Sequence, residues 1–292
     1  MERAVPGLTR VTFTNLEKVL YRDQGITKAK VIEYYIRIAP RILPFLKDRP
    51  VVLNRFPEGI DRQGFYEKDA PGGTPEWVEI FTRYSETADR DVHYIVCNTL
   101  DTLLWLANLA ALEINIPLSR TISYDTPDMV FLDLDPEPPL RFPDVTRIAM
   151  LLREHLISIG LYCYVKTSGK KGIHAVIPVL PEYTFRQTRD FAHRIGREIA
   201  AMDSLVVSEF PHSRDPGTVF VDYLQNARGK TMICPYSLRA VSGAPASTPV
   251  TWDELGGGAT PEGYNILNVP SRKENPWAKI LEDRQKLPEE YL

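Results

Sequence analysis

The sequence predicts an α+β fold in which mixed or antiparallel sheets are flanked by helices. Predicted strands and helices interleave along the 292 residues without a regular βαβ rhythm, which argues against a Rossmann fold. The chain also lacks GxGxxG and GxxxxGK[ST], the phosphate-binding motifs of dinucleotide-binding and P-loop proteins. Because no internal repeat is visible, we expect one domain over residues 1–292. Its core covers about 10–252, and a tail over about 253–292 wraps the surface.

The individual elements follow from local patterns. Apolar, β-prone runs predict strands at 10–13, 51–56, 92–97, 129–134, 162–167, 173–179 and 218–223. Capping residues and apolar spacing predict helices at 28–39, 100–113, 143–159 and 185–202. The first of these helices is expected to stop at Pro40, since proline removes a main-chain donor.

Composition excludes several classes of protein. The three cysteines are widely spaced and form no CxxC pair, which argues against a zinc site or a disulfide framework. The N-terminus MERAVPGLTR lacks the apolar core of a secretory signal, and no apolar run reaches membrane-spanning length. We therefore expect a cytoplasmic protein without a membrane partner. The net charge of −3 does not by itself indicate a nucleic-acid binder, although basic residues cluster locally.

Two acidic residues end the apolar run MVFLDLD. Asp133 and Asp135 are two positions apart, so in a strand they point to one face while Leu132 and Leu134 point to the other. Carboxylates at the end of a buried strand are costly unless a cation neutralises them, and Mg²⁺ or Mn²⁺ prefers oxygen ligands. A DxD pattern alone is also typical of a turn or a surface pair.

A third acid, Asp222, closes the run TVFVD in a similar setting. Three such carboxylates can hold two metal ions about 4 Å apart. We therefore predict that Asp133, Asp135 and Asp222 are the catalytic, metal-binding residues.

Basic and hydroxyl side chains follow these strands. The turn TSGKKGIH brings Ser168, Lys171 and His174 together with two glycines that let a ligand approach the backbone. Downstream of Asp222, Lys230 and Arg239 are candidates for stabilising charge on a triphosphate. The alternatives are a Gly-rich hairpin with exposed lysines and a solvated loop.

The ordered set of motifs resembles a known family. FLDLDP, TSGKKGIH, VFVDYLQNARGKT and PYSLRA resemble the polymerase domain of bacterial and archaeal DNA ligase D, in the archaeo-eukaryotic primase superfamily. The resemblance extends upstream to FTNLEKVLY, GITKAKVIEYY, NRFPEGI, FYEK and ALEIN. It implies a primase-like catalytic core and a template-directed polymerase that extends and gap-fills DNA ends in non-homologous end joining. It also implies two Mn²⁺ or Mg²⁺ ions and NTP or dNTP substrates, with ribonucleotides preferred.

The resemblance assigns roles residue by residue. It matches the three acids to the metal ligands, and it matches the following residues to the nucleotide site: Ser168, Lys171, His174, Gln225, Asn226, Lys230 and Arg239. For DNA, it matches Lys18 and Lys28 to the 5′-phosphate of the downstream strand, Arg55 to the template, and Phe65 or Tyr66 to a stacked base. Asn115 stands where relatives often have His, and Asn54-Arg55 where some have Lys-Arg.

The resemblance also suggests partners. We expect double-strand-break ends with a 5′-phosphate, Ku and a separate DNA ligase, because the chain has no KxDG motif. The protein would then be freestanding and nucleoid-associated. The alternatives are a replicative-type primase, a metal-dependent nuclease and a noncatalytic module that binds 5′-phosphate ends.

Overall fold

The computed structural model describes residues 10–86, 89–210, 212 and 215–292. The chain folds into two compact units, a finer division than the single domain predicted. Unit 1 comprises Met1–Pro117, Ile233–Ser247 and Tyr264–Lys273, and unit 2 comprises Leu118–Met232, Thr248–Gly263 and Glu274–Leu292. Both mix helices with largely antiparallel strands, so the predicted α+β class is confirmed.

Unit 1 contains a four-stranded sheet in the order β13-β7-β3-β4, two helices and two small two-stranded sheets. Its elements are β1 (Val19–Tyr21), β2 (Ile26–Thr27), α1 (Lys28–Leu46), β3 (Val52–Arg55), β4 (Phe65–Glu67), β5 (Glu79–Ser85), β6 (Arg90–Val96), α2 (Leu100–Asn108), β7 (Ala111–Ile116), β13 (Met232–Ile233) and the 3₁₀ turn η5 (Val269–Ser271). Strands β5 and β6 form a hairpin of their own. The run 10–13 is not a strand, so that prediction is wrong.

Helix α1 begins where the sequence predicts, because Thr27 caps it by accepting the main-chain N–H of Lys30. It then continues through Pro40 and Pro44 to Leu46, beyond the predicted end. The reason is packing: the helix buries Ile38, Ile42 and further apolar residues, and this outweighs the loss of single helical hydrogen bonds.

Helix α2 is shorter than the predicted helix at 100–113. Thr99 caps it and it begins at Leu100 as predicted, but it ends at Asn108, and Ala111–Ile116 forms β7 instead of continuing the helix. Ala110 has a positive φ of 57°, which turns the chain at this point. Strand β7 then pairs with β3, so tertiary pairing overrides the helical propensity of the run LAALE.

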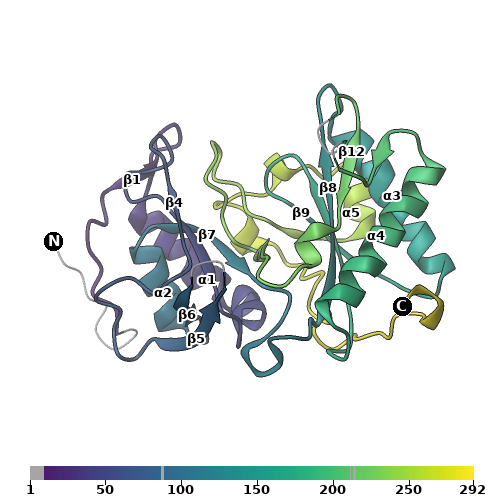
Figure 1. Cartoon of the computed structure of the whole chain (residues 1–292). Coiled ribbons are helices and arrows are strands. Elements are labelled where there is room, and N and C mark those ends of the chain that lie inside the picture. Colours follow the sequence, from purple (N-terminus) through teal and green to yellow (C-terminus); the bar gives the residue numbers. More distant parts are fainter. Residues whose placement is uncertain (1–9, 87–88, 211, 213–214) are drawn as a thin grey trace. The chain divides into compact units, whose positions relative to one another are not determined.

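Unit 2 is built on a six-stranded sheet in the order β11-β12-β8-β10-β9-β14. Its elements are the 3₁₀ turn η1 (Thr121–Ser123), β8 (Met129–Pro136), α3 (Phe142–Ser158), β9 (Tyr164–Thr167), β10 (Ile173–Pro178), α4 (Phe185–Met202), β11 (Val206–Val207), β12 (Val219–Asp222), the 3₁₀ turn η3 (Leu224–Asn226), β14 (Pro249–Val250), α5 (Trp252–Gly256) and the 3₁₀ turns η4 (Pro261–Gly263) and η6 (Glu289–Tyr291). Helices α3 and α4 pack beside each other against β8 (Figure 1).

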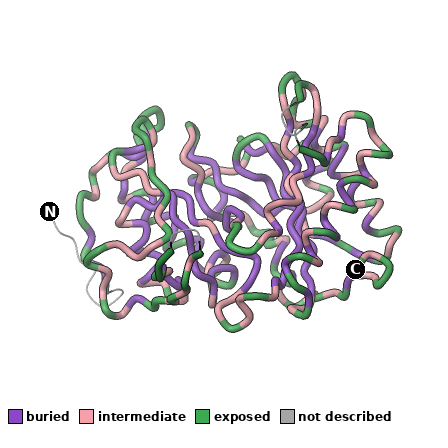
Figure 2. Tube along the Cα trace, viewed as in Figure 1, coloured by how far each residue is buried: buried purple, intermediate pink, exposed green. Residues whose placement is uncertain are grey.

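Strand β8 is central, with antiparallel partners β10 and β12 on its two sides. Leu132 and Leu134 are fully buried, as the alternating pattern predicts, whereas Asp133 and Asp135 are half-buried on the opposite face. Most residues of β8, β9, β10 and β12 are buried, and buried residues are drawn purple in Figure 2. The predicted strands at 129–134, 162–167, 173–179 and 218–223 are confirmed, as are the two helices of this unit.

The C-terminal tail does more than wrap the surface. Trp277 is buried, and its indole N–H donates to the carbonyl of Val165 across 2.9 Å, so the tail completes the core beside β9. Ile280 and Leu287 are buried as well. No helix in the described part of the chain is long and apolar enough to cross a membrane.

Candidate active site and phosphate pocket

The acidic residues predicted to act together occupy matching positions on neighbouring strands of unit 2. Asp133 on β8 is the direct cross-strand partner of Asp222 on β12. Directly opposed residues of antiparallel strands point to the same face, so these two carboxylates are neighbours. Asp135 lies two residues further along β8 on that face. The sheet register therefore brings the three acids together from positions up to 89 residues apart in sequence, from 133 to 222.

Gly172 makes room for these acids. A Cβ atom at this position would lie 3.4 Å from Asp135 Oδ1 and 3.6 Å from Asp133 Oδ1, so both carboxylates converge on the glycine. It would also lie 2.8 Å from the carbonyl oxygen of Leu134, closer than a side chain can approach. A side chain here would therefore disturb the strand that carries both acids.

Asp222 is held by the turn that follows it. Its Oδ1 accepts the main-chain N–H of Leu224 across 2.8 Å, and its Oδ2 accepts the side-chain amide of Gln225 across 3.0 Å. In this arrangement no three His, Cys, Asp or Glu side chains of the described residues are gathered closely enough to hold a metal ion. The donors nonetheless fit Mg²⁺ or Mn²⁺ in kind, since all three are carboxylates that converge on one face.

His174 extends the row of acids by one strand. It is the cross-strand partner of Asp133 on the β10 side, and its Nε2 lies 3.3 Å from Asp133 Oδ1. The imidazole is buried and meets the ring of Phe131 edge-on, with centroids 4.9 Å apart. Asp222, Asp133 and His174 thus form one continuous row across β12, β8 and β10.

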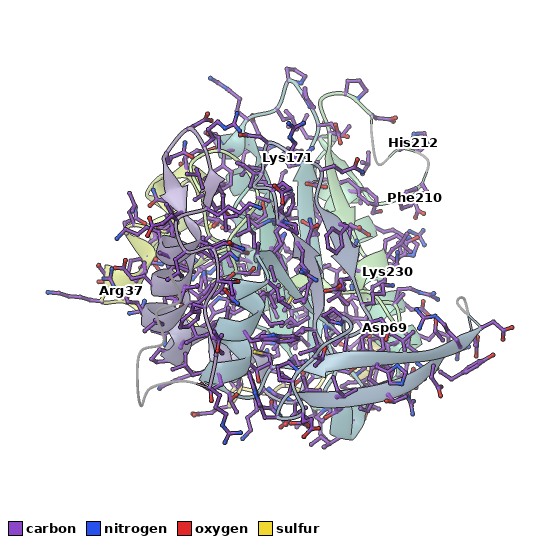
Figure 3. The ribbon with its side chains drawn as sticks, turned by 90° about the vertical axis from the view of Figure 1, so that its left-hand side faces the viewer. Arg37, Asp69, Lys171, Phe210, His212 and Lys230 are labelled. Carbon is purple, nitrogen blue, oxygen red and sulfur yellow. The ribbon has the colours of Figure 1, made fainter. Side chains whose placement is uncertain are left out.

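The turn between β9 and β10 is closed by Ser168. Its Oγ accepts the main-chain N–H groups of Lys170 and Gly172 across 3.1 and 3.0 Å, so this hydroxyl shapes the turn. Lys171 is exposed, and its Nζ donates to the carbonyl of Pro136 across 2.9 Å, at the end of the strand that carries the acids. Lys230 is also exposed and lies well apart from Lys171 on unit 2 (Figure 3).

Asn226 lies beside strand β8 and is hydrogen-bonded to its main chain. It is fully buried, its Oδ1 accepts the main-chain N–H of Phe131 across 2.8 Å, and its Nδ2 donates to the carbonyl of Phe131 across 2.6 Å. Strand β12 ends at Asp222, opposite Asp133, so it does not reach Phe131, two residues earlier on β8. At Phe131 the side-chain amide of Asn226 supplies the hydrogen bonds that a neighbouring strand would otherwise make. Asn226 therefore braces β8 in this structure, where burial and these hydrogen bonds occupy its amide, and its contact with a nucleotide stays a prediction.

Unit 1 contains a second candidate site, a pocket of about 250 Å³. Its lining is basic and includes three of the predicted DNA-binding residues, Lys18, Lys28 and Arg55; the other lining residues are Asn15, Pro57, Glu58, Asn108, Leu109 and Ala110. A phosphate group fits a pocket of this size and charge. Sequence reasoning missed Asn15 and Glu58, although both lie in the motifs FTNLEKVLY and NRFPEGI that carry the family resemblance.

The pocket's cations are held by nearby oxygens. Lys18 Nζ lies 2.6 Å from the exposed carboxylate of Glu58, and Lys28 Nζ donates to the carbonyl of Asn108 across 2.8 Å. Burial lowers the pKa of Lys28, and the charges of Lys18 and Arg55 lower it further. A phosphate would relieve this crowding of positive charge.

The main-chain N–H groups at the start of α1 already have hydrogen-bond partners. The main-chain N–H of Lys28 donates to the carbonyl of Lys18, that of Ala29 to Leu16, and that of Lys30 to the Thr27 hydroxyl. These N–H groups at the start of α1 are therefore occupied, so the lysine side chains and not the helix terminus would attract a phosphate.

Arg55 and the aromatic residues of β4 lie beside the pocket. Arg55 pairs directly with Phe65 across β3 and β4, its guanidinium lies 5.2 Å from the ring centroid, and its Nη1 binds Glu67 across 2.8 Å. Tyr66 points to the other face and is 71% exposed. Asn115 donates its side-chain amide to the carbonyl of Val52 across 3.2 Å.

Arg239 belongs to unit 1, where it is held by a buried carboxylate that sequence reasoning missed. Its Nε lies 3.0 Å from Glu113 Oε1, and the other oxygen of Glu113 accepts the side-chain amide of Asn54 across 3.0 Å. The carbonyl of Arg239 accepts the hydroxyl of Tyr21. The guanidinium is therefore fixed in position within its unit.

Comparisons with known proteins identify the family of this chain. The family model described as "LigD, primase-polymerase domain" matches residues 27–277. This chain belongs to that family. The LigD protein of Bacillus subtilis (strain 168), named as a bifunctional non-homologous end joining protein, is 35% identical over 269 residues, which is 91% of this chain and 43% of that protein.

Two mycobacterial proteins extend the comparison. The multifunctional non-homologous end joining protein LigD of Mycolicibacterium smegmatis is 35% identical over 251 residues, covering 84% of this chain and 32% of that protein. This chain thus spans less than half the length of the two LigD proteins that it matches. The solved polymerase domain of Mycobacterium tuberculosis ligase D in complex with DNA superposes with a TM-score of 0.87 at 30% identity, covering 94% of this chain and 99% of that one.

Proposed function

We propose that this chain is a metal-dependent, template-directed nucleotidyltransferase that extends and fills DNA ends during non-homologous end joining. The observation that carries the proposal is the row of acids, with Asp133 and Asp222 as direct cross-strand partners and Asp135 on the same face. This row of acids occurs in a chain that belongs to the LigD primase-polymerase family, and the relatives of this chain are named as non-homologous end joining proteins.

The three acids would hold the Mg²⁺ or Mn²⁺ ions. When bound, such ions activate a 3′-hydroxyl and neutralise the charge of the leaving pyrophosphate. Residues of the chain would hold the nucleotide around them: His174 faces Asp133, Ser168 shapes the β9–β10 turn, and Lys171 lies at the end of β8. Gln225, Lys230 and Arg239 are further proposed nucleotide-binding residues.

The basic pocket of unit 1 would receive the 5′-phosphate of the downstream strand through Lys18 and Lys28. A terminal phosphate monoester carries more charge than an internal diester, so clustered cations favour it. Support comes from the solved relative, which is in complex with DNA. Arg55 and one of the exposed aromatics, Phe65 or Tyr66, would contact the template. We further propose that Ku and a DNA ligase act at the same ends.

The test is primer extension on gapped DNA with a 5′-phosphate, in Mn²⁺ or Mg²⁺, with each NTP and dNTP. We expect template-dependent lengthening by the wild type, and losses of at least 100-fold in Asp133→Asn and Asp222→Asn. Both variants should also bind Mn²⁺ more weakly in a direct titration. Asp190→Asn, which removes an exposed charge from α4 in the same unit, serves as the control.

The outcomes separate the alternatives. Shortened products would indicate a nuclease, and synthesis without a primer would indicate a primase. Tight binding of 5′-phosphorylated ends with unchanged DNA would indicate a noncatalytic module. Extension by Asp133→Asn at the wild-type rate would refute the assignment of the acids.

A further inference from the structure

The C-terminal end of α2 holds two cations of the pocket in unit 1. Asn108 is the last residue of this helix, and Leu109 is its C-cap. The carbonyl of Asn108 accepts the ammonium of Lys28 across 2.8 Å, and the carbonyl of Leu109 accepts the Nε–H of Arg55 across 3.0 Å. Carbonyls at the end of a helix lack partners within it and lie at the negative end of its dipole, so they suit cations. These neutral groups orient both side chains without adding a negative charge to the pocket.

The side chain of Asn108 binds another part of the pocket, the segment before β1. Its Oδ1 accepts the main-chain N–H of Thr14 across 3.0 Å, and its Nδ2 donates to the carbonyl of Thr12 across 3.3 Å. This segment leads directly into the pocket, because Asn15 lines it and the carbonyl of Asn15 accepts the main-chain N–H of Lys18 across 3.0 Å. Asn108 therefore connects the backbone that carries one lysine to the side chain of the other.

We propose that Asn108 is a positioning residue of the phosphate pocket. Its carbonyl holds the ammonium of Lys28, and its amide fixes the segment that leads to Lys18, so both lysines are in place before a phosphate arrives. Such preorganisation strengthens binding, because less conformational freedom is lost when the ligand binds. It also favours a terminal phosphate, whose three free oxygens can reach both cations at once. The consequence for DNA rests on the proposed function, whereas the fixing of the segment does not.

Amide hydrogen exchange in the protein without DNA tests the fixing of the segment. We expect the N–H of Thr14 to exchange at least about tenfold faster in Asn108→Ala than in the wild type, because the variant lacks its acceptor. Phe13 in the same segment is buried, so the variant should fold. Thr99→Ala, which removes the cap at the other end of α2, is the matched control and should leave Thr14 protected. A Thr14 N–H that exchanges in the wild type as fast as in an unstructured peptide would overturn the proposal, whether or not the variant folds.

Titrations with gapped DNA test the consequence for binding. The measured quantity is the dissociation constant for DNA with a 5′-hydroxyl divided by that for the same DNA with a 5′-phosphate. We expect this ratio to fall from about tenfold in the wild type to about threefold or less in Asn108→Ala, although Lys18, Lys28 and Arg55 all remain. Thr99→Ala should keep the wild-type ratio, since it weakens the same helix away from the pocket.

The outcomes separate this role from the proposed function on which it rests. An unchanged ratio in Asn108→Ala would overturn the positioning role alone. An equal fall in Thr99→Ala would also overturn it, because any weakening of α2 would then have the same effect. Equal affinity of the wild type for both DNAs would remove the proposed phosphate pocket itself, and the role of Asn108 with it.

Discussion

The main-chain N–H of Lys28 donates to the main-chain carbonyl of Lys18 across 2.8 Å. This hydrogen bond fastens the loop before β1 to the start of α1, so the two lysines reach the same pocket on a fixed backbone. The pocket's charge is therefore set by the fold and not by the chance positions of flexible side chains. Arg55 adds a third cation from β3.

The first prediction concerns these lysines. The wild type should bind gapped DNA with a 5′-phosphate about tenfold more tightly than the same DNA with a 5′-hydroxyl, since charge-assisted contacts are worth about 1.5–3 kcal/mol. Lys18→Ala/Lys28→Ala should bind both DNAs alike. The preference should also shrink as salt rises. Titrations by fluorescence anisotropy measure these affinities.

The matched control for that prediction is Lys30→Ala, which removes an exposed lysine from the same turn of α1, where it pairs with Glu33. Its preference for the 5′-phosphate should stay at the wild-type level. Equal wild-type affinity for both DNAs would refute the role of the pocket, and a preference that survives in the double variant would assign the phosphate to other residues.

The second prediction is a pH profile. Burial and the charges of Lys18 and Arg55 lower the pKa of Lys28, so it loses its proton at a lower pH than an exposed lysine does. Preference for the 5′-phosphate should therefore fall as pH rises through this lowered pKa. It should also fall below about pH 6, where the phosphate monoester takes up a proton. Glu58, which pairs with Lys18 across 2.6 Å, is the carboxylate among the residues that line the pocket.

Lys28→Arg provides the control for the pH profile, since a guanidinium keeps its charge throughout. We expect the alkaline fall to disappear in this variant while the acidic fall remains. The ratio of the two dissociation constants, measured from about pH 5 to about pH 10, reports both limbs. An alkaline limb that is identical in Lys28→Arg would show that another group titrates.

How far the sequence predicts this structure depends on the range of the interactions. Alternation placed Asp133 and Asp135 on one face, and the starts of α1 and α2 were predicted correctly, because these signals are local. The end of α1 and the existence of β7 were missed because distant packing decides them. Asn108 and Glu113 were missed for the same reason: only the fold brings them beside Thr14 and Arg239.

The third prediction tests Asn226 as a brace. Asn226→Ala leaves the buried N–H and carbonyl of Phe131 without the amide that now pairs with both, at a cost of about 2–4 kcal/mol of unfolding free energy. We expect a clear fall in the denaturant midpoint. Gln225→Ala, in the same turn but half-buried, should cost much less. A stable Asn226→Ala protein with a raised nucleotide KM would favour a nucleotide contact instead.

The last prediction concerns Gly172, whose missing side chain leaves room beside the acids. In Gly172→Ala the new Cβ would meet the carbonyl of Leu134 at 2.8 Å, so either β8 or the β9–β10 turn must move. Overpacking of this kind costs about 1–3 kcal/mol, and a shift of β8 also displaces Asp133 and Asp135. We therefore expect lower stability together with weaker Mn²⁺ binding and at least tenfold slower extension. Gly263→Ala is the control, because a Cβ there meets nothing within 4 Å. Wild-type Mn²⁺ affinity and extension rate in Gly172→Ala would show that the close approach of this turn to the acids is not needed for metal binding.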